Sequence, residues 1–168
     1  FLSTCDISQP INFFIDKGQV VFISVEEIIT IRALEGSYPN YAQLLPSSFS
    51  NELEFDRKDF IASLERIAVL ADQHNNVIKI TTDSSSNLIK ISTDAQDIGT
   101  GSESLSVSFK GESFQIAFNV RYLLDGLKVI DSNYIKLSCN GPTTPAVFSP
   151  VNSDVNFTYL VMPIQIRN

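Results

Sequence analysis

The chain has 168 residues, of which 43% are hydrophobic and 18% are charged, and this balance is typical of a globular rather than a disordered protein. Its formal net charge of −7 argues against a tight electrostatic grip on nucleic acid, although loose contact through one locally basic surface stays open. No apolar run approaches the length of a membrane span, and the first residues lack the basic region of a signal peptide. Two cysteines, Cys5 and Cys139, are too few for a disulfide framework, so we expect a reduced, cytoplasmic protein.

Three short runs rich in Phe, Ile and Val predict strands at the start of the chain. They are Ile11–Ile15, Gln19–Val25 and Ile28–Leu34, and we expect them to form two consecutive hairpins. A segment rich in helix and strand breakers then extends to Pro46, yet it carries large apolar side chains. We interpret it as a connector that lies pinned on a packed surface and presents side chains to a partner.

After the connector, a pattern of one strand, one helix and three strands occurs twice. The first copy begins with a strand at Leu53–Phe55, and Asp56 follows at the N-cap position of a helix. The apolar residues of this helix recur on one face: Phe60, Leu64, Ile67, Ala68 and Ala71. The three strands are expected at Val77–Thr82, Leu88–Thr93 and Leu105–Phe109, with turn residues at 83–87 and 99–102.

The second copy has the same layout. A strand at Phe114–Phe118 leads to a second N-cap at Asn119 and to an apolar helix stripe that consists of Val120, Leu123, Leu124 and Leu127. Its three strands are expected at Tyr134–Cys139, Pro145–Ser149 and Phe157–Pro163. The sequence therefore predicts an α+β fold with an internal repeat. The opening strands match the tail of an earlier copy, so we expect a domain remnant at 1–46, a complete domain at 47–168, and a longer parent protein.

No residue pattern carries a specific catalytic or metal-binding signature. His74 has no second His or Cys at ligand spacing and is interpreted as a solvated loop residue. Gly99-Thr100-Gly101 lacks the Lys of a phosphate loop, and Ser84-Ser85-Ser86 has no base nearby; both are interpreted as turns. We therefore expect a protein that is not an enzyme and needs no cofactor.

Two features each allow two interpretations. Arg121 and Lys128 lie opposite the leucines of the second helix, where Arg121 could pair with Asp125 or both cations could form a weak basic face toward nucleic acid. The end of the chain, Tyr159–Ile166, is apolar and contains Pro163. It could be the last core strand, or a strand that leaves its sheet and lines a groove.

Three segments resemble motifs of one family, the bacterial DNA polymerase III beta subunits, or sliding clamps. The connector Glu35-Gly36-Ser37-Tyr38-Pro39-Asn40-Tyr41, with Leu45-Pro46, is similar to the family's inter-domain segment. The start of the second helix, Phe118-Asn119-Val120-Arg121-Tyr122-Leu123-Leu124-Asp125, and the end of the chain, Tyr159-Leu160-Val161-Met162-Pro163-Ile164, are similar to two further family motifs. The resemblance covers nearly the whole chain, apart from residues 1–9.

The resemblance implies a DNA-clamp fold, with helices on one face of antiparallel sheets. It also implies a processivity factor that, as a ring of two subunits, encircles duplex DNA without reading sequence and tethers the replicative polymerase, the clamp loader and repair proteins. This chain would be the latter part of the middle domain plus the whole third domain. Arg121 and Lys128 would face DNA, where weak phosphate contact permits sliding.

The family's partner pocket binds an extended peptide with apolar anchors. The positions that match it here are Pro39, Gln43, Leu44, Asn119, Tyr122, Thr143, Pro145, Leu160, Val161, Met162, Pro163, Ile164 and Gln165. The chain departs from the family pattern at Gln43, where a basic residue is common, at Asn75, where some members have an aromatic residue, and in its two extra terminal residues.

Ring closure in the family uses an apolar contact that matches Val69 and Leu70 at the end of the first helix. An alternative interpretation is a stand-alone clamp-fold module that binds proteins without forming a ring. The reading frame upstream of Phe1 discriminates between the two, because a fragment must be preceded by further clamp domains.

Overall fold

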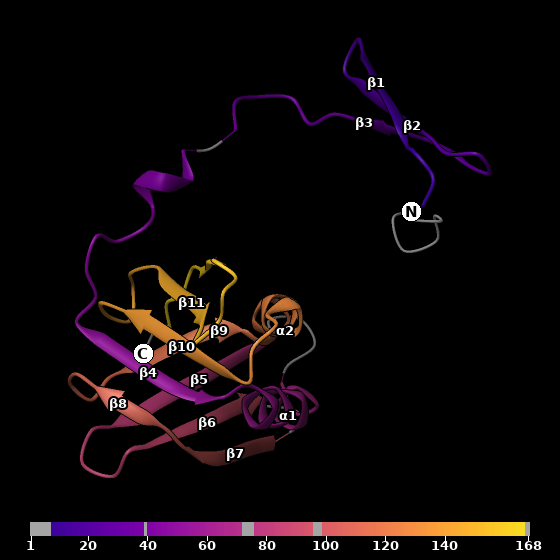
Figure 1. The fold of residues 1–168 in the computed structure, drawn as a ribbon. Coiled ribbons are helices and arrows are strands. Elements are labelled where there is room, and N and C mark those ends of the chain that lie inside the picture. Colours follow the sequence, from indigo (N-terminus) through magenta and orange to yellow (C-terminus); the bar gives the residue numbers. More distant parts are fainter. Residues whose placement is uncertain (1–7, 39, 72–75, 96–98, 167–168) are drawn as a thin grey trace. The chain divides into compact units, whose positions relative to one another are not determined.

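The computed structural model of the chain describes residues 8–38, 40–71, 76–95 and 99–166, and it divides into two compact units, residues 1–40 and 41–168. Figure 1 shows strands in both units, whereas the two α-helices belong to the second. Among the described residues, no helix has the length and apolar character needed to cross a membrane.

The first unit is an antiparallel sheet of three strands in the order β1-β2-β3. Their bounds are Asn12–Asp16, Gln19–Ile23 and Ile28–Arg32. Lys17 and Gly18 both have positive φ, which is the geometry of a two-residue hairpin turn whose twist suits the flanking strands. The predicted hairpins are thus present, and large apolar side chains on these strands, such as Phe14 and Ile28, are exposed.

The second unit opens with the short 3-10 helix η1 (Tyr41–Gln43) and then contains the first copy of the repeat. Asp56 caps helix α1 as predicted, because its side chain accepts hydrogen bonds from the backbone N–H groups of Lys58 and Asp59. The elements are β4 (Asn51–Asp56), α1 (Arg57–Ala68), β5 (Val77–Asp83), β6 (Leu88–Ala95), β7 (Gly99–Ser106) and β8 (Ser108–Lys110).

The second copy follows directly, and its helix is capped by the predicted Asn119, whose side chain accepts from the Arg121 N–H. The elements are β9 (Gln115–Asn119), α2 (Val120–Val129), β10 (Tyr134–Cys139), β11 (Ala146–Pro150) and β12 (Tyr159–Val161). The predicted order of strand, helix and three strands is confirmed in the second copy; in the first copy a fourth short strand, β8, follows the three.

Each copy places its first strand in the sheet of the other copy. One sheet has the order β12-β11-β10-β4-β8, so β4 pairs with β10 of the second copy. The other has the order β7-β6-β5-β9, so β9 pairs with β5 of the first copy. The two copies therefore form one interlocked domain.

The turn predicted at 99–102 is wrong, because Gly99–Ser106 form one strand, β7, which pairs with β6 along its whole length. A side chain on Gly101 would overlap the end of the Leu70 side chain, so glycine at this position lets Leu70 pack closely on β7. The strand predicted at Leu105–Phe109 is divided at Val107, since β7 pairs with β6 and β8 pairs with β4 in the other sheet. The chain turns a corner between the sheets at this residue.

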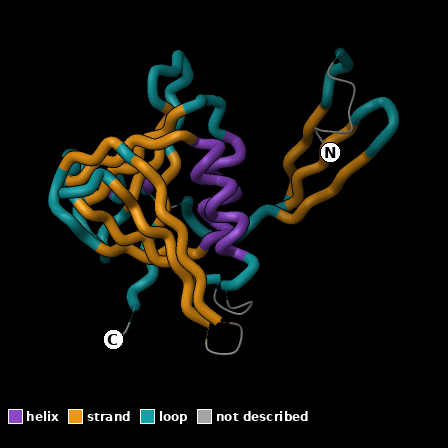
Figure 2. The backbone as a smooth tube through the Cα atoms, turned by 90° about the horizontal axis from the view of Figure 1, so that it is seen from below, coloured by secondary structure: helices purple, strands orange, loops and turns teal. Residues whose placement is uncertain are grey.

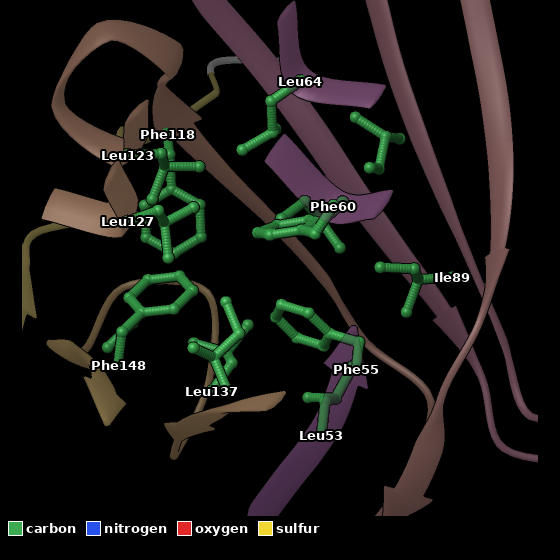
Figure 3. Packing of buried hydrophobic residues seen from close by; sticks show 14 of the residues in the cluster. Leu53, Phe55, Phe60, Leu64, Ile89, Phe118, Leu123, Leu127, Leu137 and Phe148 are labelled. Carbon is green, nitrogen blue, oxygen red and sulfur yellow. The ribbon is translucent and has the colours of Figure 1, made fainter. Parts of the chain in front are cut away.

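The core lies between the two sheets and the inner faces of the helices. Phe60 and Leu64 of α1 belong to the same buried cluster as Leu123 and Leu127 of α2, and Figure 3 shows Phe55 and Phe148 of the strands below them. The two helices lie side by side and leave their outer faces uncovered by strands (Figures 1 and 2). Lys128 of α2 forms an ion pair with Glu65 of α1 at 2.7 Å, which links these outer faces.

Candidate functional site

The end of the chain crosses from one sheet to the other. Strand β12 pairs with β11, and the backbone N–H of Ile164, just beyond Pro163, then donates to the carbonyl of Ala117 in β9 at 2.8 Å. The chain leaves its sheet after Val161. Of the two interpretations of this segment, a strand that leaves its sheet and lines a groove is therefore the one that fits. We call residues 159–166 the tail.

Tyr159 fixes the tail to helix α2. Its hydroxyl donates to the backbone carbonyl of Tyr122 at 2.8 Å, and its ring lies where a side chain on Gly126 would be. Burial raises the pKa of Tyr159, and the nearby carboxylate of Asp125 raises it further. The phenol therefore stays protonated and keeps its role as a hydrogen-bond donor at physiological pH.

Side chains beyond Tyr159 alternate between core and surface, as a strand requires. Val161 is buried in the core, whereas Leu160 is half-buried and Met162 is 55% exposed. The tail thus uses Val161 for attachment and offers Leu160 and Met162 for contact.

The start of α2 contributes polar and aromatic groups near the point where Tyr159 is attached. The Asn119 side-chain oxygen is engaged as the helix cap, accepting from the Arg121 N–H at 2.9 Å. Tyr122 is 61% exposed although its carbonyl binds Tyr159. We call Asn119, Tyr122 and the tail residues Leu160–Pro163 the anchor surface.

A groove of about 350 Å³ lies between the tail and β9. It brings together three of the residues predicted from sequence, Thr143, Ile164 and Gln165. Its further lining residues escaped the sequence analysis: Gln115, Ala117, Pro142 and Ile166. Gln115 is an exposed polar residue directly before the buried residues Ile116–Phe118 of β9, and this change from polar to apolar is the signal that could have found it.

The other described positions predicted for the peptide pocket are neither in the groove nor part of the anchor surface. Gln43 and Leu44, in and just after η1, are exposed, and Pro145 is half-buried before β11. Pro39 lies outside the described residues, as do His74, Asn75 and Cys5.

The two residues matched to ring closure have different environments. Val69 is 76% exposed, whereas Leu70 is half-buried over Gly101 of β7. Strand β7 is an edge strand, because it pairs with β6 alone in its sheet. The end of α1 and the edge of β7 thus form one continuous surface.

An ion pair holds α1 against this edge strand. The Arg66 guanidinium binds both carboxylate oxygens of Glu103 in β7, each at 2.7 Å, and also donates to the buried Ser63 hydroxyl. The hydrogen bond from Arg66, followed by that from Ser63, lowers the pKa of Glu103 to about 2.

The two cations of α2 are not equivalent. Lys128 is engaged with Glu65, and the predicted pairing of Arg121 with Asp125 is not among the ion pairs between described residues. Arg121 is exposed on the outer face of α2.

Comparison with known proteins assigns the chain to a family. Residues 42–165 match the family model described as DNA polymerase III beta subunit, C-terminal domain. The chain belongs to the DNA polymerase III beta subunit family. The matched residues contain both copies of the repeat, from β4 to the tail.

Relatives in this family are similar over nearly the whole chain. A beta sliding clamp of Synechococcus elongatus is 46% identical over 95% of the chain, and one of Synechocystis is 42% identical over 96%. The crystal structure of a DNA polymerase sliding clamp from Bacillus subtilis has a TM-score of 0.77 at 28% identity and covers 94% of the chain. The chain spans about 42% of the length of these curated relatives and 41% of the B. subtilis chain.

The thiol of Cys139, in β10 of this beta-subunit domain, is buried. Burial raises the pKa of the Cys139 thiol to about 11, so it stays protonated and unreactive. Within the described ranges, no group of three or more His, Cys, Asp or Glu residues could hold a metal ion.

We predict that Gly126→Ala destabilises the domain although alanine favours helices. The added methyl group would overlap the Tyr159 ring, and such overpacking costs about 1–3 kcal/mol, against a helix gain of about 1 kcal/mol. Urea unfolding of a double-mutant cycle with Tyr159→Ala measures this. In the Tyr159→Ala background the same Gly126→Ala change should become stabilising; an unchanged sign would contradict the packing described here.

We predict that the stabilising effect of Glu103 depends on pH. Its pKa is lower in the folded domain than the ordinary value of 4.5, so its contribution is complete above about pH 4.5 and declines as the pH falls toward 2. The difference between the urea midpoints of wild type and Glu103→Gln should therefore be largest at pH 6 and should shrink by about half or more as the pH falls to 2.5–3. A difference that is constant over this range would contradict the role given to the Arg66–Glu103 pair, and Glu112→Gln, at an exposed loop carboxylate, is the control.

Proposed function

We propose that this chain is the C-terminal part of a DNA sliding clamp, a non-catalytic processivity factor that encircles duplex DNA and tethers replication proteins. The observation that carries the proposal is the anchor surface, where the tail is fixed to α2 while Leu160, Met162 and Tyr122 stay accessible. The names of the relatives, beta sliding clamp and DNA polymerase sliding clamp, support it.

The exposed apolar side chains of the first unit support the proposal that this chain is part of a longer protein. Its three strands expose Phe13, Phe14, Ile15 and Ile28, each more than half exposed within that unit. A sheet with such apolar side chains needs another layer of structure to cover them. We therefore place this unit in a middle domain whose other part lies outside this chain, and we place the domain boundary in the connector, with residues 47–168 as the third domain.

The helices are the surface proposed to face DNA. Arg121 is free to contact phosphates, whereas Lys128 shares its charge with Glu65. A protein that slides along DNA needs few positive charges, some of them paired with carboxylates, since many phosphate contacts would hold it in place.

The end of α1 and the edge of β7 are proposed as the contact with the neighbouring subunit of a two-subunit ring. Val69 supplies an exposed apolar side chain there, and β7 supplies unpaired backbone groups at the sheet edge. Leu70 and the Arg66–Glu103 pair keep α1 packed on β7 and are not themselves proposed to contact the neighbouring subunit.

The anchor surface is proposed to bind short peptides of the polymerase, the clamp loader and repair proteins. Two apolar side chains of an extended peptide would contact Leu160 and Met162, with the flexible thioether of Met162 adapting to different anchors. Gln43, Leu44, Thr143, Pro145, Ile164 and Gln165 are the further positions proposed to contribute.

We predict that Leu160→Ala and Met162→Ala each weaken peptide binding about tenfold, because truncation of a central apolar contact costs about 1–2 kcal/mol. Fluorescence anisotropy of a labelled polymerase-derived peptide with apolar anchors, titrated with the chain, measures this. Val155→Ala removes an apolar side chain of the loop before β12 that is about as exposed as Met162, and it serves as the control. Equal affinity for wild type and both variants would rule out the anchor surface as the peptide site.

A further inference from the structure

Among the strands of the described residues, β9 pairs with β5 alone, so one edge of β9 is left open by its sheet. The carbonyl of Phe114 accepts from Thr82 and the N–H of Val120 donates to Asn76, both on the β5 side. Since backbone groups alternate along an antiparallel strand, Ile116 and Phe118 also face β5, whereas Gln115 and Ala117 direct their backbone groups to the open edge.

The tail forms a hydrogen bond with one of these outward backbone groups. The carbonyl of Ala117 accepts from Ile164, and no second bond of the tail to β9 follows between described residues. In the part of the chain that the structure describes, the N–H and carbonyl of Gln115 and the N–H of Ala117 have no hydrogen-bond partner. The groove of about 350 Å³ opens where the tail diverges.

The lining of this groove limits what can fill it. Three side chains can form hydrogen bonds, those of Gln115, Thr143 and Gln165, and the other lining residues are apolar. None of the seven carries a charge, so a charged ligand would lose hydration without an opposite charge in return. The backbone N–H and carbonyl of Gln115 both point outward. They can form a pair of hydrogen bonds with the carbonyl and N–H of one residue in an extended peptide.

We propose that a short, uncharged, extended segment of a partner peptide adds to the open edge of β9 and hydrogen-bonds to the backbone of Gln115. The segment is the part of the peptide that flanks its apolar anchors, since Ile164 and Gln165 belong both to the groove and to the tail that carries the anchor surface. The inference thus rests on the proposed peptide site, and it extends that site to residues that supply backbone rather than side-chain contacts.

The first arm of the test compares peptides. A labelled anchor peptide is titrated with the chain, together with versions that carry four Thr and Val residues before or after the anchors. One flank should strengthen binding about tenfold, the amount expected for two additional backbone hydrogen bonds. N-methylation of the flank's backbone nitrogens should remove the gain, because it removes the donors.

The second arm compares Gln115→Pro with Gln115→Ala. Proline removes the outward N–H, which β5 does not use, and is tolerated at such edge positions, while alanine keeps the N–H and loses only the side chain. The ratio of flanked to unflanked affinity should fall to about threefold in the proline variant, which keeps the carbonyl acceptor, and stay near tenfold in the alanine variant. Thermal unfolding of both variants verifies that they are folded.

The outcomes distinguish the β9 inference from the proposed anchor surface. An unflanked peptide that binds while neither flank adds affinity overturns the β9 inference and leaves the anchor surface intact; no binding of any peptide overturns both. A gain that stays near tenfold in Gln115→Pro, or that survives N-methylation of the flank, also overturns the β9 inference. Slow hydrogen exchange of the Gln115 amide in the peptide-free chain would mean that the chain's own end occupies the edge, and this too would contradict the proposal.

Discussion

The ring of Tyr159 lies over Gly126, and its hydroxyl binds the Tyr122 carbonyl, so the start of the tail is fixed to α2. This contact joins the last strand of the domain to its second helix. Because of it, Val161 enters the core, Met162 stays accessible, and Ile164 reaches Ala117 in the other sheet. The accessible apolar residues and the groove beside β9 both follow from the position of this one aromatic side chain.

The interlocked repeat explains why the tail needs such an attachment. Each copy lends its first strand to the sheet of the other, so neither sheet is complete without both copies. The last strand, β12, is short and lies at a sheet edge, where ladder hydrogen bonds on one side alone would hold it weakly. Tyr159 compensates with a side-chain contact. A surface at the edge of a sheet can then be both exposed and well defined, which is what recognition of a short peptide requires.

Much of this architecture was predictable from sequence because local signals agree with the fold. Asp56 and Asn119 mark both helix starts, and the apolar stripe through Phe60 and Leu64 faces the core. The residues Gly99–Ser102 predict a turn, since glycine and serine disfavour strands, but pairing with β6 along the whole of β7 outweighs that preference. The open edge of β9 left no sequence signal, because backbone groups are common to all residue types. The Glu65–Lys128 pair was likewise missed, because it joins two helices far apart in the chain.

The account's central claim is that the tail and the start of α2 form one peptide-binding surface. Chemical-shift mapping of the isotope-labelled chain, titrated with an unlabelled polymerase-derived peptide with apolar anchors, tests it most directly. The account predicts that the largest amide shifts fall at Leu160–Gln165 and at Asn119–Tyr122, with small changes along β6 and β7. Shifts centred on β6, on β7 or on the end of α1, or their absence at saturating peptide, would contradict it.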